Sequence, residues 1–235
     1  MKVLVVPFCY NEHVKIERTL ARFPKERPYD VLVMDDGSTD GSPARIHEMG
    51  FEVLSHPERR GVGAAIQTIN RYALEKGYEV IVHMAGNDKD DPLLIPRLLD
   101  ALAAGADYVQ GSRYAKGGDF GNMPVYRVLA TRFVHPLLFS LVSGMRVTDS
   151  TNGFRAYRTK LLLDSRIDLA QDWLRQYELE PYFFCKTIRL GYKVVEVPVT
   201  KFYPPKELGY TKMAPLTGWW SILRPLVYLG LGLKK

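Results

Sequence analysis

Short apolar runs that alternate with helical patterns constrain the fold of this 235-residue chain more than any other feature. In the first half, the runs suited to strands cover residues 3–7, 29–34, 51–55, 79–84 and 106–110. The segments between them have helical periodicity, at residues 14–23, 42–49, 61–76 and 93–103. Strands that alternate with helices form βαβ units, whose parallel sheet is covered by helices on both faces. The sequence therefore predicts an α/β, Rossmann-like fold with a mostly parallel central sheet.

The second half departs from this alternation after Gly111. It predicts a loop at residues 116–122, an apolar helix at 125–142, a polar turn at 148–155, helical material to about residue 190 and a strand at 193–198. We find no interdomain linker and no internal repeat in the sequence. We therefore expect one domain over residues 1–213, followed by a C-terminal amphipathic helix at 214–235.

The composition is that of an ordinary globular protein, with 46% hydrophobic and 25% charged residues. The two cysteines, Cys9 and Cys185, are too far apart for a ligand-like spacing. This argues against a disulfide framework or a zinc site and fits a reducing, cytoplasmic compartment. The formal net charge of +6 favours anionic partners, but the basic residues are scattered, so we do not expect nucleic-acid binding.

The two ends of the chain bear on membrane association. The N-terminal apolar run is strand-like and too short for a signal peptide. Residues 216–233 come closest to a membrane-spanning segment, but Arg224 and Pro225 interrupt them. The paired tryptophans and terminal lysines suit the headgroup region of a bilayer. We expect peripheral contact at the inner face of the cell membrane; a helix docked on the sheet or in a dimer interface is the alternative.

Polar loops follow the first two predicted strands. They are Pro7-Phe8-Cys9-Tyr10-Asn11-Glu12 and Asp35-Asp36-Gly37-Ser38-Thr39-Asp40. A single acidic pair before Gly-Ser could be only a helix cap and tight turn. Two such loops at neighbouring strand ends indicate a ligand cleft, because ligands of open α/β sheets bind beyond the carboxyl ends of the strands. Carboxylates there can accept hydrogen bonds from a nucleobase or a ribose.

These loops resemble the Pro-x-Tyr-Asn-Glu and Asp-Asp-Gly-Ser-x-Asp segments of glycosyltransferase family 2, with one extra residue here between Pro7 and Tyr10. The resemblance continues in order over roughly residues 3–213. Its further segments are Arg60-Gly61-Val62-Gly63-Ala64-Ala65, Gly111-Ser112-Arg113-Tyr114 with Lys116-Gly117-Gly118, Asp149-Ser150-Thr151-Asn152-Gly153-Phe154-Arg155, and Glu196-Val197-Pro198-Val199. The last three are similar to segments of the polyprenyl-phosphate mannosyl- and glucosyltransferases.

The resemblance implies a glycosyltransferase A-type fold and an inverting transfer of a hexose from a UDP- or GDP-sugar. The implied acceptor is a polyprenyl-phosphate lipid or a cell-surface glycan. Residues 1–111 would form the nucleotide-sugar-binding half and residues 112–213 the acceptor-side half. The residues implied in nucleotide-sugar binding are Pro7, Tyr10, Asn11, Glu12, Asp35, Asp36, Gly37, Arg60, Gly61, Gly86, Asn87, Arg113, Arg127 and Lys212.

Among these, Asp36 would bind the base or ribose, and Arg113 would reach the diphosphate or an acceptor phosphate, where its fork of donors suits bidentate contact. Arg127 is a second candidate for a phosphate contact, and a solvated helix arginine is the alternative. Lys212 lies in a segment whose lysine contacts a phosphate in the polyprenyl-phosphate branch. A purely structural role, in a pair with a carboxylate, is open for Arg155.

The chain departs from the family after the fourth strand. The family has Asp-x-Asp there, which binds a divalent metal between the donor phosphates, whereas this chain has Ala85-Gly86-Asn87-Asp88-Lys89-Asp90-Asp91-Pro92. Three interpretations are open. Asn87, Asp88 and Asp90 could still hold Mg²⁺ or Mn²⁺; Lys89 could supply the positive charge itself; or catalysis could be lost.

The catalytic residues implied by the resemblance are Asp149, as acceptor contact or general base, and Arg113. Asp172 and Glu178 are alternatives for the base, and a turn-capping role is the alternative for Asp149. A phosphate acceptor is already ionised and hardly needs a base. A non-catalytic nucleotide-sugar-binding protein is the main rival function, and a nucleotidyltransferase ranks last because residues 8–12 are not glycine-rich and basic. The oligomeric state is not readable from the sequence.

Overall fold

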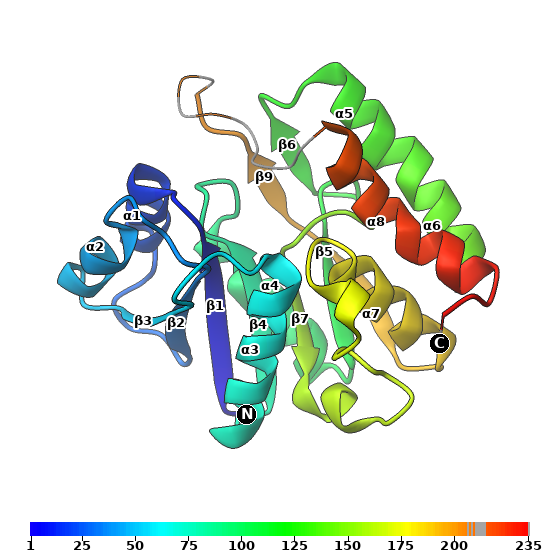
Figure 1. Cartoon of the computed structure of the whole chain (residues 1–235), viewed down its shortest axis with the longest axis horizontal. Coiled ribbons are helices and arrows are strands. Elements are labelled where there is room, and N and C mark those ends of the chain that lie inside the picture. Colours follow the sequence, from blue (N-terminus) through cyan, green and yellow to red (C-terminus); the bar gives the residue numbers. More distant parts are fainter. Residues whose placement is uncertain (206, 208, 210–214, 235) are drawn as a thin grey trace.

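The computed structural model describes residues 1–205, 207, 209 and 215–234, and it has the predicted alternation of strands and helices (Figure 1). The strands are β1 (Val3–Cys9), β2 (Asp30–Asp35), β3 (Glu52–Ser55), β4 (Val80–Ala85), β5 (Tyr108–Ser112), β6 (Asp119–Gly121), β7 (Arg155–Arg158), β8 (Val194–Pro198) and β9 (Thr200–Phe202). The α-helices are α1 (His13–Ala21), α2 (Ser42–Glu48), α3 (Val62–Glu75), α4 (Ile95–Ala103), α5 (Val125–Leu129), α6 (His135–Ser143), α7 (Leu179–Arg189) and α8 (Pro215–Gly230). Shorter helical segments are η1 (Pro92–Leu94), the π-helical η2 (Ala130–Val134), η3 (Thr159–Leu163) and η4 (Asp172–Leu174).

Seven strands form the central sheet in the order β3-β2-β1-β4-β7-β5-β8. All neighbouring pairs are parallel except those of β7, which runs antiparallel to both β4 and β5. The predicted mostly parallel α/β sheet is therefore confirmed. A separate two-stranded sheet pairs β6 with β9.

Strand β7 was not predicted, because the sequence indicated a turn and then helical material there. Its two terminal arginines hide the strand pattern in the sequence. In the structure, Arg155 is buried and paired with Glu180 at 3.0 Å, while Arg158 donates to the Leu102 carbonyl at 2.7 Å. The partners that make a strand possible are supplied by distant parts of the chain, which a local pattern does not reveal.

The side chains of the sheet alternate between two apolar cores. Leu4 and Val6 of β1 point to the core under α3, α6, α7 and α8, whereas Val3 and Val5 point to the core under α1, α2 and α4. This period of two along a strand that is buried on both faces explains its continuous apolar run. In Figure 1 the strands β3, β2, β1, β4, β7 and β5 follow one another across the view in the order of the sheet.

The apolar segment at 125–142 is helical as predicted, over α5, η2 and α6 in succession. Among the described residues, this helix (Val125–Ser143) is the one that is long and apolar enough to cross a membrane. Of its most apolar stretch of 18 residues, 28% is buried inside the protein. The sequence had pointed instead to residues 216–233. In the structure α8 lies against α6 and α7 (Figure 1). Its Leu226 and Leu229 are buried in the core.

Candidate active site

A pocket lies where the loops after β1, β2 and β4 meet, at the carboxyl ends of these strands. Four of the predicted binding residues line it: Tyr10, Glu12, Asp36 and Asn87. Pro7 lies inside β1, paired with Met84, and the last two residues of this strand, Phe8 and Cys9, line the pocket.

The Asp36 carboxylate holds the loop that precedes α3. It accepts hydrogen bonds from the backbone N–H of Arg60 at 2.9 Å and of Gly61 at 2.8 Å, and lies 2.9 Å from His56 Nδ1. Arg60 and Gly61 thus contribute backbone groups to the site. The neighbouring Arg59 side chain lines the pocket and stacks 4.6 Å from the centroid of the Tyr10 ring.

The loops after β1 and β2 are tied to each other. Asn11, at φ 49°, accepts from the Thr39 backbone N–H through Oδ1 at 2.7 Å, and its own N–H donates to Ser38 Oγ at 2.7 Å. Asp35 is buried and accepts from the Ser38 N–H at 3.1 Å. Gly37 has φ +76°, and a Cβ there would lie 2.4 Å from the Glu58 carbonyl carbon, so only glycine allows this approach. Asn11, Asp35 and Gly37 therefore support the loops that form the pocket and do not line it themselves.

Sequence patterns missed the part of the pocket supplied by Gln176, Tyr177 and Glu180. This segment is brought in by α3, since the Ala64 N–H donates to the Arg175 carbonyl at 3.1 Å. A Cβ on Gly63 would lie 2.1 Å from the Leu174 carbonyl oxygen. The glycine at this helix start was visible in the sequence, but the segment that packs on it, more than 100 residues later, was not.

The predicted metal ligands after β4 point in different directions. Gly86 packs its backbone on β1, and Asn87 then lines the pocket. Asp88, at φ 63°, turns to α1, where its Oδ1 lies 3.1 Å from Arg22 Nη2. Asp90 is fully buried; one oxygen accepts from the Ala85 N–H at 2.8 Å and the other bonds Lys201.

The expected metal-ligand set of Asn87, Asp88 and Asp90 is therefore not assembled. The left-handed turn at Asp88 separates the three side chains, and basic partners hold both carboxylates. Within the part of the chain that the structure describes, no three His, Cys, Asp or Glu side chains are grouped to hold a metal ion. Hard divalent cations need several oxygen ligands, so these residues do not fit one.

Lys89 lies in this same loop and is only 7% exposed. Its Nζ lies 4.4 Å from the centroid of the Tyr203 ring, and the Arg127 guanidinium lies 5.9 Å from the same centroid. Burial, together with the nearby cations Lys201, Lys15 and Arg127, lowers the pKa of Lys89 to about 7. The structure thus gathers cationic side chains beside the pocket.

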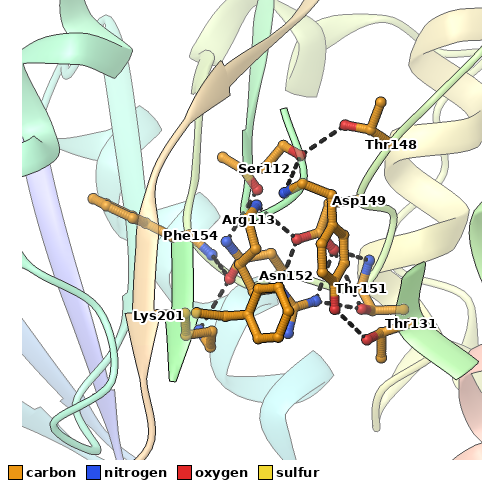
Figure 2. Close-up of polar contacts among 12 residues, drawn as sticks. Ser112, Arg113, Thr131, Thr148, Asp149, Thr151, Asn152, Phe154 and Lys201 are labelled. Atoms are coloured by element: carbon orange, nitrogen blue, oxygen red, sulfur yellow. Dashed lines mark hydrogen bonds and ion pairs between the residues drawn. The ribbon is translucent and has the colours of Figure 1, made fainter. Parts of the chain in front are cut away.

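Arg113 and Asp149 are buried against each other, as Figure 2 shows. Arg113 donates from Nε to Asp149 Oδ2 at 2.6 Å and from Nη2 to Oδ1 at 2.7 Å. Although burial disfavours the charged guanidinium, the Asp149 carboxylate outweighs it and raises the pKa of Arg113. Nη2 also donates to Thr151 Oγ1 at 2.8 Å, and Glu196 accepts from the Asp149 N–H at 2.9 Å. Both oxygens of Asp149 are therefore engaged by Arg113.

The remaining candidates lie apart from this pair. Glu178 is bound to Arg224 of α8 at 2.6 Å, and Asp172 is on the surface beside Arg175. Arg155 has the structural role left open above, because it pairs with Glu180. Lys212 lies outside the described residues.

Comparisons with known proteins agree on the kind of protein. Residues 4–165 match the model of the family described as "Glycosyl transferase family 2". The undecaprenyl-phosphate mannosyltransferase of Micrococcus luteus is 34% identical over 220 residues, covering 91% of this chain and 88% of that protein. The polyprenol monophosphomannose synthase of Mycolicibacterium smegmatis is also 34% identical, covering 91% of this chain and 81% of that protein.

The fold is shared with solved glucosyl-3-phosphoglycerate synthase from Mycobacterium tuberculosis, in complex with Mn²⁺, UDP and phosphoglyceric acid. The TM-score is 0.71 at 21% identity, over 98% of this chain and 78% of that one. At this identity the likeness extends to the fold alone. The matched family model covers more than half of the chain, and the two relatives each cover nine-tenths of it. This chain is a glycosyltransferase and belongs to glycosyl transferase family 2.

Proposed function

We propose that this chain transfers a hexose from a nucleoside diphosphate sugar to the phosphate of a polyprenyl lipid at the cytoplasmic face of the membrane, with inversion at the anomeric carbon. One observation supports the lipid acceptor above all. The helix formed by α5, η2 and α6 carries a buried cation on one side and exposed apolar side chains on the other.

The cation on this helix is Arg127, which is 8% exposed and whose Nη1 lies 3.4 Å from the Tyr203 hydroxyl. The exposed apolar residues are Val125, Tyr126, Leu129, Phe133, Val134, Leu137, Leu138 and Leu141, each between 41% and 74% exposed. Their helical spacing places them in one band, which suits the apolar layer of a membrane. A lipid phosphate bound at Arg127 would have its hydrocarbon chain beside this band.

The pocket beyond β1, β2 and β4 suits the nucleoside of the donor. Tyr10 and Tyr177 offer aromatic faces to a base, and the charged or amide groups of Glu12 and Asn87 can bond hydroxyls. An oxygen of the lipid phosphate would attack the anomeric carbon while the bond to the donor diphosphate breaks and its electron pair leaves with the diphosphate. The acceptor is already ionised, so no side chain has to remove a proton.

Within this proposal, Arg113 and Asp149 are positioning residues. Their paired contacts fix the loop after β5 against the turn 148–155. Arg127 and Lys89, which lie over the Tyr203 ring, are the side chains that would contact the anions. A general base at Asp149 is not needed for a phosphate acceptor. A glycan hydroxyl acceptor would need a general base to remove its proton. The two kinds of acceptor therefore differ in whether the site must supply a base.

The test is release of nucleoside diphosphate from a panel of UDP-, GDP- and dTDP-sugars. Each reaction contains undecaprenyl phosphate, undecaprenol or no lipid, and the lipid product is separated by chromatography. We expect release with one donor that needs the phosphorylated lipid. Release with undecaprenol or with a glycan would refute the phosphate acceptor, and donor binding without any transfer would favour a non-catalytic sugar-nucleotide-binding protein.

The Arg127→Met variant tests the acceptor site. We expect its KM for undecaprenyl phosphate to rise about 10-fold or more, because a hydrogen-bonded charge is lost, while donor affinity changes little. Arg71→Met, at an exposed position of α3, is the matched control. Equal KM values in the two variants would exclude Arg127 as the phosphate ligand.

A further inference from the structure

The loop after β4 contains no carboxylate that faces the donor pocket. Of its three acidic side chains, Asp88 and Asp90 are held by Arg22 and Lys201 on either side of the loop, and Asp91 accepts from the Leu93 N–H at the start of η1. The pocket receives Asn87 instead, whose buried Oδ1 has no hydrogen-bond partner among the described residues. An amide oxygen can accept a bond from a hydroxyl of a bound ligand, but alone it is not a metal site.

The same loop places an amine where it has other cations as neighbours. Lys89 and Arg127 lie over one aromatic ring, that of Tyr203. Lys15 lies 2.7 Å from Glu12, which lines the pocket. The cations thus extend from the pocket wall at Glu12 to the acceptor side of the site at Arg127.

Three cations, Lys201, Lys15 and Arg127, act on Lys89. Lys201 and Lys15 are themselves paired with Asp90 and Glu12, whereas Arg127 lies over the same Tyr203 ring as Lys89. The buried cations Lys89 and Arg127 repel each other, and an anion bound beside them offsets this cost. A nucleoside diphosphate is such an anion, and its diphosphate would extend from the pocket in the direction of Arg127.

We propose that Lys89 binds the donor diphosphate in place of a divalent cation, so that this chain binds its donor without metal. The inference rests on the proposed function. During transfer, the bond between the anomeric carbon and the diphosphate oxygen breaks, and the electron pair stays on that oxygen. The bound diphosphate favours the charged form of Lys89, and the Lys89 ammonium stabilises the charge on that oxygen by direct contact.

The experiment measures binding by isothermal titration calorimetry, with UDP and GDP as probes and UMP and GMP for comparison. Each titration is run in EDTA and in Mn²⁺ or Mg²⁺. We expect the preferred diphosphate to bind in EDTA with an affinity that metal changes by less than about threefold. Lys89→Met should weaken diphosphate binding about 10- to 100-fold, as expected for a hydrogen bond to a charged group, and monophosphate binding much less.

Three further variants test whether the charge at position 89 accounts for the result. Lys89→Arg keeps the charge and should retain most of the affinity, and Lys25→Met, at an exposed position, should match the wild type. The triple variant Lys89→Met, Ala85→Asp, Asn87→Asp restores the family's two aspartates and should regain affinity only with Mn²⁺. Thermal unfolding of each variant shows whether it is folded.

Diphosphate binding that is lost in EDTA and restored by Mn²⁺ in the wild type would overturn the inference and leave the proposed function standing. Equal diphosphate affinity of Lys89→Met and the wild type would also overturn it. Failure of both nucleotides to bind under all conditions would instead count against the proposed function together with this inference.

Discussion

The buried pair of Arg113 and Asp149 allows a quantitative prediction about stability. Asp149 is fully buried, Arg113 is 3% exposed, and two short side-chain contacts of 2.6 and 2.7 Å join them. Asp149→Asn removes the negative charge and turns an amide N–H₂ toward the guanidinium, so that a buried cation loses its counter-charge. Removal of one partner of a buried pair costs about 3–5 kcal/mol.

For a chain of this size, about 1 kcal/mol shifts the Tm by about 2–4 °C, so we expect a fall of about 6–20 °C. The assay is thermal unfolding followed by circular dichroism, with urea titration at 25 °C as a second measurement. Asp172→Asn is the matched control, because Asp172 pairs with Arg175 at the surface and should change the Tm little. A Tm of Asp149→Asn within about 2 °C of the wild type would refute the assignment of this pair as a structural anchor.

Three further predictions concern packing, pH and membrane binding. Gly63→Ala puts a methyl 2.1 Å from a backbone carbonyl and should cost about 1–3 kcal/mol and weaken nucleotide binding, measured by urea titration and calorimetry. Burial lowers the pKa of His83 well below 6.5, so the free energy of unfolding falls as the pH drops below about 6.5. His83→Gln should remove this dependence and flatten the plot of unfolding free energy against pH between about pH 7 and 5 by up to about 1.4 kcal/mol per pH unit. Urea titrations that give parallel plots for the variant and the wild type would contradict this. The double variant Leu137→Glu, Leu141→Glu should bind anionic vesicles more weakly in co-sedimentation than the wild type, whereas Leu163→Glu, at an equally exposed leucine outside the band, should not.

Local patterns were sufficient for the central part of the fold. The apolar runs predicted β1, β2, β4 and β5, because strands buried on both faces are continuous in hydrophobicity. They did not predict β7, since Arg155 and Arg158 interrupt the pattern and are satisfied only by partners in other elements. The helix at 125–142 was predicted, but not that it would expose more large apolar side chains than the described part of the C-terminal segment.

The candidate site was predicted in part for the same reason. The position of Tyr10, Glu12, Asp36 and Asn87 at one pocket follows from parallel strands that end at one edge of the sheet. The roles of the backbone at Gly61 and of the segment 176–180 depend on how α3 meets a later loop.

The sequence by itself determined the α/β sheet, the edge of that sheet where ligands bind and the loss of two aspartates after β4. Only the tertiary structure decided that Asp88 and Asp90 turn to Arg22 and Lys201, and that Arg113 is paired with Asp149. The physical reason is the separation along the chain of the residues that determine each feature. Strand and helix periodicity follows from neighbours along the chain, whereas the direction and partner of a charged side chain depend on residues tens to more than 100 positions away.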